Sequence, residues 1–232
     1  MSTQAPVLRF ALPDDDGLAQ IIDHLRTCGM DLPSMDQAGL YRVEDPLGRG
    51  VDFEFFKLAP SDVGTYVEHG MTQLGVMSTD YLVESDAEVW RPFTFSYGSY
   101  PVVLAALQGM SFEQLTSKPV VRLATSLPNL TRDIFAARGM AIEVVPVNDV
   151  DAACVFGLVD AYVARLNDPQ ALKKNGFRVL ELLGSTHLKL VINRVCYAQH
   201  GEAISELIHR LYTTQPEPPA PMEIPFDRDD LS

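Results

Sequence analysis

Val120-Val121-Arg122-Leu123-Ala124-Thr125 opens the stretch 120–177, from which the fold can be predicted. A short β-branched, apolar run of this kind is typical of a buried strand. The turn-forming residues 126–132 follow and start a helix, with Asn129 or Thr131 as the predicted N-cap. Residues 142–147 and 160–163 predict two further strands. The order strand, helix, strand, helix, strand indicates a parallel sheet whose loops gather at one edge.

The flanking sequence extends this alternating pattern in both directions. A helix is predicted from Leu18 to Cys28–Gly29, a second is capped by Ser61 or Asp62, and a last one carries an apolar stripe at Ala203, Ile204, Leu207 and Ile208. The predicted strands outside the central stretch are 7–12, 40–43, 51–58, 74–77, 89–95, 101–107, 179–183 and 188–192. Residues 214–232 are rich in proline and acid, and are expected to form a disordered tail or to lie on a neighbouring subunit.

Composition narrows the possible partners. The net charge of −13 repels phosphate backbones, so nucleic acid is not an expected partner. No apolar run approaches the roughly 20 residues that span a bilayer, and the first residues lack the basic start and apolar core of a signal peptide. The three cysteines are widely spaced, which predicts buried free thiols in a reducing cytoplasm rather than disulfides or a zinc site.

Three stretches resemble a known enzyme family. They are RLATSLPNLTRDIFAARGMAIEVV (122–145), GLVDAYVARLNDPQALKKNGF (157–177) and DVGTYVEHGMTQLGVMSTDYLVES (62–85), and they resemble the short-form catalytic subunit of ATP phosphoribosyltransferase. The resemblance covers about residues 7–213. It implies an α/β fold of the two-domain, type II periplasmic-binding-protein kind, with an interdomain cleft, and a homodimer. The implied domains are 1–95 plus 178–213, and 96–177.

One loop departs from the family pattern. Where the family's phosphoribosyl pyrophosphate loop has Asp, three residues, then Thr-Gly-x-Thr-Leu, this chain has Ala164, three residues, then Asp168-Pro169-Gln170-Ala171-Leu172. The Asp168 carboxylate would repel phosphate. Pro169 has no N–H and cannot adopt the left-handed geometry that glycine provides. The phosphate site is therefore predicted to be lost.

Three other departures remove positive charge. The family's Leu-Pro-Lys-Gly-Arg becomes Leu12-Pro13-Asp14-Asp15-Asp16, its Arg-Ala becomes Ala59-Pro60, and its Cys-Arg-Leu becomes Tyr100-Pro101-Val102. Because each charge-assisted contact contributes roughly 1.5–3 kcal/mol, losing the set would cost well over ~6 kcal/mol of affinity for a diphosphate.

Candidate site residues lie near the implied cleft, and many of them occupy positions that match the family. Asp80, Glu68 and Asp160 are the predicted catalytic carboxylates, with Asp160 expected at the end of a strand. Several have competing structural explanations: Tyr97 could form a stacking wall or pack in the core, Arg132 could bind an anion or a surface carboxylate, and Lys57 could replace a missing arginine. No spacing predicts a metal site. The predicted ligand-binding set is Asp14, Lys57, Ser78, Tyr97, Ser126, Asn129, Thr131, Arg132 and Asp151.

Three functions fit these observations. The first is an enzyme that acts on a small organic molecule other than phosphoribosyl pyrophosphate, by acid/base, lyase-type chemistry in the interdomain cleft. The second is a genuine phosphoribosyl or glycosyl transferase whose phosphate site is rebuilt from Arg165, Lys173 and Lys174. The third is a non-catalytic binding or regulatory subunit. All three predict a small-molecule ligand, and the cofactor, substrate and reaction stay open.

Overall fold

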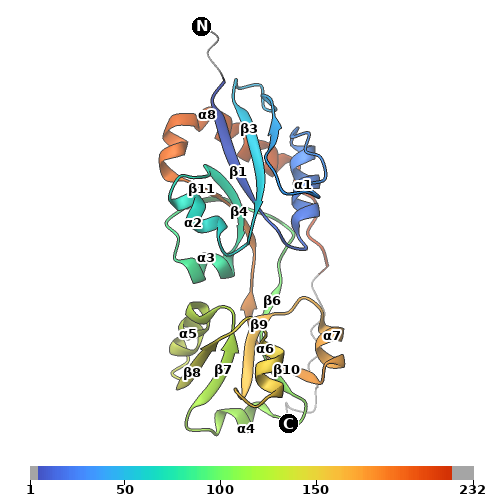
Figure 1. The fold of residues 1–232 in the computed structure, drawn as a ribbon, viewed down its shortest axis with the longest axis vertical. Helices are drawn as coiled ribbons and strands as arrows, with labels where there is room; N and C mark the ends of the chain where they lie inside the picture. The colour runs from blue at the N-terminus through green and yellow to red at the C-terminus, as the bar shows by residue number, and fades with distance from the viewer. Residues whose placement is uncertain (1–4, 221–232) are drawn as a thin grey trace. The chain divides into compact units, whose positions relative to one another are not determined.

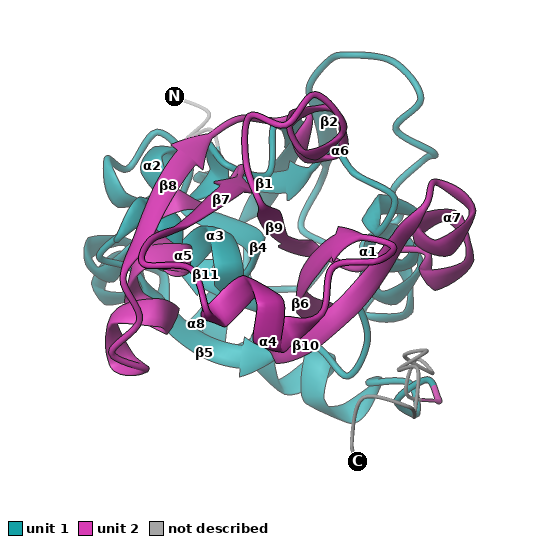
Figure 2. Cartoon of the chain, turned by 90° about the horizontal axis from the view of Figure 1, so that it is seen from below, with its two compact units in different colours: residues 1–98, 187–219 teal, residues 99–186, 220–232 magenta. Residues whose placement is uncertain are grey.

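The chain folds into two compact units, seen in a computed structural model that describes residues 5–220. Unit 1 contains residues up to Gly98 together with His187–Pro219, and unit 2 contains Ser99–Thr186 (Figure 2). The expected return to the first domain at residue 178 is too early. Residues 177–185 form a strand that pairs with strand 101–107 inside unit 2, so the chain returns only after Thr186.

Unit 1 is built on a six-stranded sheet with the order β2-β3-β1-β4-β11-β5. Strands β1, β3, β4 and β11 of this sheet are labelled in Figure 1. Strands β1, β3 and β4 are parallel to one another, whereas β2, β11 and β5 each run antiparallel to a neighbour. The strands agree with the predicted ones to within a residue or two at each end. Their bounds are β1 Val7–Pro13, β2 Tyr41–Val43, β3 Asp52–Leu58, β4 Leu74–Ser78, β5 Trp90–Thr94 and β11 Leu188–Ile192.

Helices cover both faces of this sheet. On one face, β1 residues Leu8, Phe10 and Leu12 pack with apolar side chains of α1 and α8. On the other face, Ala11 packs with residues of α2 and α3. Successive side chains of a strand point to opposite faces, and this is why β1 contributes to both layers. The helices are α1 Leu18–Thr27, α2 Val63–Glu68, α3 Thr79–Ser85 and α8 Arg194–Thr213.

Unit 2 is built on a five-stranded sheet with the order β10-β6-β9-β7-β8. As the sequence predicts, β7, β8 and β9 are parallel. Strand β6 runs antiparallel to β9, and β10 runs antiparallel to β6. The bounds are β6 Pro101–Leu107, β7 Val121–Thr125, β8 Ile142–Pro146, β9 Ala161–Arg165 and β10 Phe177–Ser185.

The helices of unit 2 also lie on both faces of their sheet. Helices α4 and α5 contribute Leu115 and Phe135 to one apolar layer, and α6 and α7 contribute Cys154 and Leu172 to the other. The bounds are α4 Phe112–Thr116, α5 Pro128–Ala137, α6 Val150–Val155 and α7 Pro169–Lys174. The predicted N-cap of α5 is wrong: Leu127 is the N-cap, and both Asn129 and Thr131 lie inside the helix.

Gly98 ends unit 1 in a conformation that only glycine adopts readily. Its φ is +67°, and a Cβ built there would lie 2.2 Å from Cδ1 of Leu188. Both the left-handed backbone and the close contact therefore require glycine.

The tail prediction is only partly within the described residues. Thr214 is the C-cap of α8, and the Ser96 hydroxyl donates a 2.7 Å hydrogen bond to the Pro216 carbonyl. Residues 221–232 lie outside the described part of the chain. Within the described part, no helix combines the length and apolarity that crossing a bilayer demands.

Candidate functional site

Three loops meet at the carboxyl-end edge of the parallel strands in unit 2. They connect β7 to α5, β8 to α6 and β9 to α7. Pro101 at the start of β6 and Ser185 at the end of β10 lie at the same edge, because Leu166 donates its N–H to the Pro101 carbonyl and Ser185 pairs with Pro101. Ligands of parallel α/β sheets bind at this edge, so it is the candidate site in unit 2.

The loop from β7 to α5 is organised by a buried hydroxyl. The Thr125 Oγ1 atom accepts a 2.9 Å hydrogen bond from Leu127 N and a 3.3 Å hydrogen bond from the Thr131 hydroxyl. Both threonines are fully buried. Thr131 therefore supports the loop from inside and does not contact a ligand, contrary to the prediction. Ser126, by contrast, is exposed.

Asn129 and Arg132 occupy the exposed start of α5. The Arg132 guanidinium donates a 3.1 Å hydrogen bond to Asn129 Oδ1 within the first turns of the helix. These two side chains and Ser126 are therefore the members of the predicted set that the fold brings together on one exposed loop. A guanidinium beside an amide and a hydroxyl can bind a carboxylate or a single phosphate group.

In the loop from β9 to α7, the carboxylate of Asp168 binds the backbone amides at the start of α7. One carboxylate oxygen of Asp168 accepts hydrogen bonds from Gln170 N at 2.8 Å and Ala171 N at 3.1 Å. Pro169 fills the first helical position and has no N–H. The first amides of α7, which could otherwise face an anionic ligand, are thus bound by a side chain of the chain itself.

The loop from β8 to α6 repeats this arrangement. The Asp149 carboxylate accepts a 3.1 Å hydrogen bond from Ala152 N and is the N-cap of α6. In the first turn of α6, Asp151 is half-buried, and the Asn175 side-chain amide donates a 3.5 Å hydrogen bond to its carboxylate. Burial raises the pKa of Tyr162, and a hydrogen bond to Asp151 raises that pKa further. Asp151 consequently connects α6 to β9 and to the end of α7.

Positive charge is sparse around these loops. Arg165 ends β9, and its guanidinium carbon lies 5.5 Å from the centroid of the Tyr100 ring, in cation–π geometry. Lys173 and Lys174 lie in the last turn of α7, at the end of the helix away from Asp168. Of the three cations considered as replacements for a phosphate site, only Arg165 belongs to the carboxyl-end edge.

The corresponding edge of unit 1 holds four of the other predicted residues. Lys57 is near the end of β3 and forms a 3.1 Å ion pair with Asp14, which follows β1. The Ser78 hydroxyl, at the end of β4, donates a hydrogen bond to the Asp80 carboxylate, and both side chains are buried. Asp80 lies in the first turn of α3, where a carboxylate complements the helix dipole.

Asp160 is not where the sequence placed it. It precedes β9, at the amino-end edge of the sheet, instead of ending a strand. Its buried carboxylate accepts hydrogen bonds from Lys118 Nζ at 2.7 Å, the Arg122 guanidinium at 3.1 Å and Arg122 N at 2.9 Å. Burial alone would raise the pKa of Asp160, but these hydrogen bonds lower it to about 2. A carboxylate so strongly held in its charged form stabilises the sheet and is a poor proton carrier.

Glu68 lies away from the carboxyl-end edge, and Tyr97 takes the second of its two expected roles, packing in the core. Glu68 ends α2 on the side of the sheet where β4 and β5 begin, and its carboxylate accepts a 3.1 Å hydrogen bond from Glu88 N. The Tyr97 side chain is 1% exposed, and its hydroxyl lies 3.1 Å from His24 Nδ1. Tyr97 is therefore a core residue and cannot be a stacking wall, because a ligand could not reach its ring.

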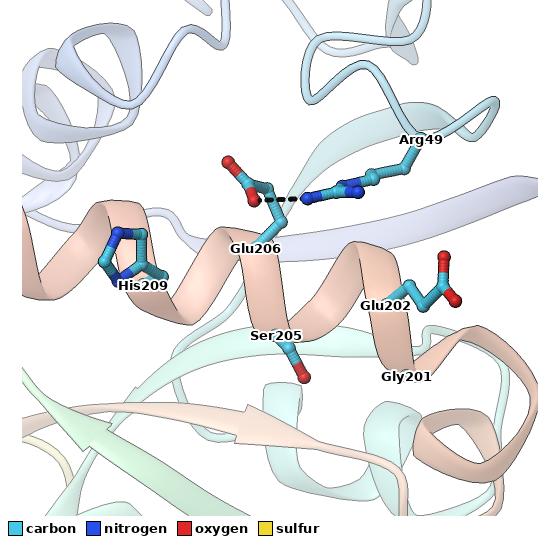
Figure 3. A pocket seen from close by; sticks show the side chains of 6 residues that line it. All are labelled: Arg49, Gly201, Glu202, Ser205, Glu206 and His209. Carbon is cyan, nitrogen blue, oxygen red and sulfur yellow. Dashed lines mark hydrogen bonds and ion pairs between the residues drawn. The ribbon is translucent and has the colours of Figure 1, made fainter.

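A pocket of about 380 Å³ lies elsewhere in unit 1, on the exposed side of α8 (Figure 3). It is lined by Gly201, Glu202, Ser205, Glu206 and His209 from α8 and by Arg49 from the turn before β3. Arg49 and Glu206 form a 2.9 Å ion pair across it (Figure 3). No residue of the predicted site lines this pocket.

Metal and thiol chemistry receive no support from the geometry. Within residues 5–220, no three His, Cys, Asp or Glu side chains are arranged to hold a metal ion. All three cysteines are buried, and burial raises the pKa of Cys154 to about 12 and that of Cys196 to about 11. Such thiols are not nucleophiles at neutral pH.

Sequence reasoning missed the capping roles of Asp149 and Asp168. The signal was present, because Asp168-Pro169 before a short helical pattern is a combination typical of an N-cap followed by the first helical position. The role of Thr125 had no such signal, since a buried hydroxyl at the end of a strand is recognised only when the loop geometry is known.

Comparison with known proteins places this geometry in a family. The family described as HisG, ATP phosphoribosyltransferase, matches residues 59–213. An ATP phosphoribosyltransferase of Geobacillus sp. (strain WCH70) is 29% identical over 213 residues, which are 91% of this chain and 100% of the relative.

Solved structures agree with the fold. The ATP phosphoribosyl transferase (HisG:HisZ) complex of Thermotoga maritima has a chain that matches with a TM-score of 0.74 and 24% identity, covering 89% of this chain and 97% of that one. The periplasmic aliphatic sulphonate binding protein SsuA of Escherichia coli matches with a TM-score of 0.59 and 16% identity, covering 90% of this chain and 68% of that one. The fold is thus of the type II periplasmic-binding-protein kind. With a family match over about two-thirds of its length, the chain belongs to the ATP phosphoribosyltransferase family.

Proposed function

We propose that this chain is a diverged member of its family, an enzyme that acts on a small organic molecule other than phosphoribosyl pyrophosphate. The observation that carries the proposal is the hydrogen bonding of Asp168, whose carboxylate occupies the amides of Gln170 and Ala171. In this family, the same loop is the one that the sequence resemblance assigns to the sugar diphosphate.

An anion would bind this loop only at a considerable free-energy cost. It would have to displace the Asp168 cap, which stabilises the helix by about 1 kcal/mol, and then remain beside the displaced carboxylate. Two unit charges about 4 Å apart near a protein surface repel each other by roughly 4 kcal/mol. Pro169 offers no N–H in compensation. Together these terms oppose a diphosphate far more than a neutral or cationic ligand.

The cations near the predicted site point in the same direction. Lys57 is paired with Asp14, and Arg165 packs on Tyr100. Lys173 and Lys174 lie at the far end of α7, which disfavours a phosphate site rebuilt from them. Arg132, on the exposed turn with Asn129, is the cation best placed to bind one anionic group. A neutral, cationic or singly anionic ligand fits this balance of charge.

Acid/base chemistry is the proposed reaction type, and it rests on the match of the predicted carboxylates to the family. Asp80 is 3% exposed and accepts a hydrogen bond from Ser78, so it supports the start of α3 and is not assigned a ligand contact. Ser126, Asn129 and Arg132 are proposed to hold the ligand in unit 2. Location in the cytoplasm and assembly as a homodimer complete the proposal. The first is supported by the free, buried cysteines, and the second rests on the family resemblance alone.

A thermal-shift experiment with a restored loop tests the proposal. The double variant Asp168→Thr, Pro169→Gly puts the family's residues back into the loop. We expect phosphoribosyl pyrophosphate with Mg²⁺ to leave the melting temperature of the natural chain unchanged and to raise that of the double variant. The matched control is Asp149→Thr, which removes the other capping carboxylate of the same edge without touching the loop.

The outcomes separate the candidate functions. If phosphoribosyl pyrophosphate stabilises the natural chain by several degrees, or if it is consumed in the presence of ATP, the diverged function is wrong and the chain is a working phosphoribosyltransferase. Mass spectrometry of the denatured natural protein, looking for a retained small molecule, provides the first identification of the true ligand class.

A further inference from the structure

A second pocket of about 400 Å³ lies on unit 1, at the start of β5 and of α8. It is lined by Val89, Trp90, Arg91, Arg194 and Tyr197. The Trp90 and Tyr197 rings meet edge to face, with their centroids 4.6 Å apart, and remain 37% and 40% exposed. We call this feature the Trp90 groove. Its volume falls within the range of about 300–1,000 Å³ that is typical of ligand pockets.

The two arginines of the Trp90 groove are available to a ligand. Both are exposed, and within residues 5–220 neither Arg91 nor Arg194 takes part in an ion pair or a side-chain hydrogen bond. Arg194 is the first residue of α8, where the helix dipole disfavours a cation. Helix stability therefore does not explain Arg194. Two unpaired guanidinium groups beside exposed rings are suited to an acidic segment with apolar anchors.

We propose that the Trp90 groove binds residues 221–232 of the same chain. This segment, Pro-Met-Glu-Ile-Pro-Phe-Asp-Arg-Asp-Asp-Leu-Ser, carries four carboxylates and one cation. Ile224, Pro225 and Phe226 supply apolar surface for the two rings, and Asp227, Asp229 and Asp230 supply charge for the two arginines. The complementarity holds for both the apolar and the charged parts of the groove.

The preceding residues begin close to the same strand. The Tyr212 hydroxyl donates to the Pro92 carbonyl at 3.1 Å, and the Ser96 hydroxyl donates to the Pro216 carbonyl at 2.7 Å. Trp90 lies six residues before Ser96, or about 20 Å of extended chain. From Pro216 to Asp229 there are thirteen residues, which can span about 43 Å. The acidic segment is long enough to turn back to the groove.

Fluorescence reports on this groove directly, because Trp90 is the single tryptophan of the chain. We expect deletion of residues 221–232 to shift the Trp90 emission to longer wavelength and to increase its quenching by acrylamide. Phe226→Ser should produce the same change in the full-length chain. The charge reversal Arg91→Glu, Arg194→Glu should do so too, and adding Asp229→Arg and Asp230→Arg to it should restore protection.

A control variant tests whether the change in Trp90 quenching is specific to the charges of the Trp90 groove. Lys173→Glu, Lys174→Glu makes the same change of charge on α7 and should leave Trp90 quenching as it is. If the deletion leaves emission and quenching unchanged, the proposal is wrong. It is also wrong if protection disappears on dilution, which would indicate the segment of a second copy. Circular dichroism of each variant confirms that the fold is retained.

Discussion

The two edges of the sheet in unit 2 use aspartates in opposite ways. At the amino-end edge, Asp160 is buried and bound by Lys118 and Arg122, and its pKa is lowered to about 2. At the carboxyl-end edge, Asp149 and Asp168 are exposed and accept hydrogen bonds from backbone amides at helix starts. The aspartate at the amino-end edge is thus bound by side-chain cations, whereas the two at the carboxyl-end edge are bound by backbone amides.

The two aspartates are expected to contribute to different properties, Asp160 to the stability of the fold and Asp168 to the choice of ligand. The ion pairs of Asp160 join β7 and the loop after α4 to the start of β9, and breaking them should lower the free energy of unfolding. The cap of Asp168 should contribute less to stability, and under the proposed function its main effect is on which ligands the loop accepts, because its carboxylate already binds the amides of Gln170 and Ala171. Four predictions test this division, and they run from the largest effect to the smallest.

The largest effect is expected from Asp160→Asn. The substitution removes the charge and leaves Lys118 and Arg122 without their partner. Since hydrogen bonds to charged groups contribute about 1.5–3 kcal/mol, we expect the free energy of unfolding to fall by roughly 2 kcal/mol. Urea denaturation monitored by circular dichroism measures this free energy of unfolding. A loss below about 0.5 kcal/mol, the range of ordinary surface changes, would contradict the assigned role.

A moderate effect is expected from Asp168→Ala. Removing an N-cap side chain costs about 1 kcal/mol, and the amides of Gln170 and Ala171 lose their acceptor. The matched variant Asp168→Asn keeps a good cap and should have nearly the stability of the natural chain. Equal losses in the two variants would show that charge, and not capping, is what Asp168 contributes.

Acid should lower the free energy of unfolding by removing the contribution of Asp160 at the amino-end edge. The pKa of Asp160 is about 2 in the folded chain and 3.8 in its ordinary state, so between these values the unfolded chain binds more protons. The contribution of Asp160 is therefore complete above pH 3.8 and is lost as the pH falls toward 2. Unfolding measured across this range should depend less on pH in Asp160→Asn than in the natural chain.

The smallest effect on stability is expected from Arg132→Ala. Its hydrogen bond to Asn129 is exposed and contributes only about 0.2–0.5 kcal/mol to the helix. The expected consequence lies in binding, because Arg132 is the proposed contact for an anionic group. An unchanged melting temperature together with weaker ligand-induced stabilisation would support that role, and unchanged ligand stabilisation would exclude it.

Much of the fold could be predicted because its signals are local. Strand β7 is a β-branched run that stays buried, and Pro101–Leu107 forms β6 with the predicted bounds. The return of the chain to unit 1 could not be predicted in the same way. Strand β10 belongs to unit 2 because it pairs with β6, which lies about 75 residues earlier, and pairing over that separation leaves no local pattern.

The candidate site was less predictable, and the reasons are specific. Asp160 lies next to a strand in the sequence, but only the pairing of β9 with β7 places it at the amino-end edge beside Arg122. Tyr97 is polar at one end and compatible with a surface site. Its burial against His24 becomes visible only once α1 packs on the sheet.

The sequence by itself determined the alternation of strands and helices, the balance of charge and the Asp168-Pro169 pair that starts α7. These properties depend on residue type and short-range periodicity. Tertiary structure alone decided which carboxylates meet cations and which meet backbone amides, because that depends on the edge of the sheet at which each strand ends. The same side chain, aspartate, consequently binds cations at position 160 and caps a helix at position 168.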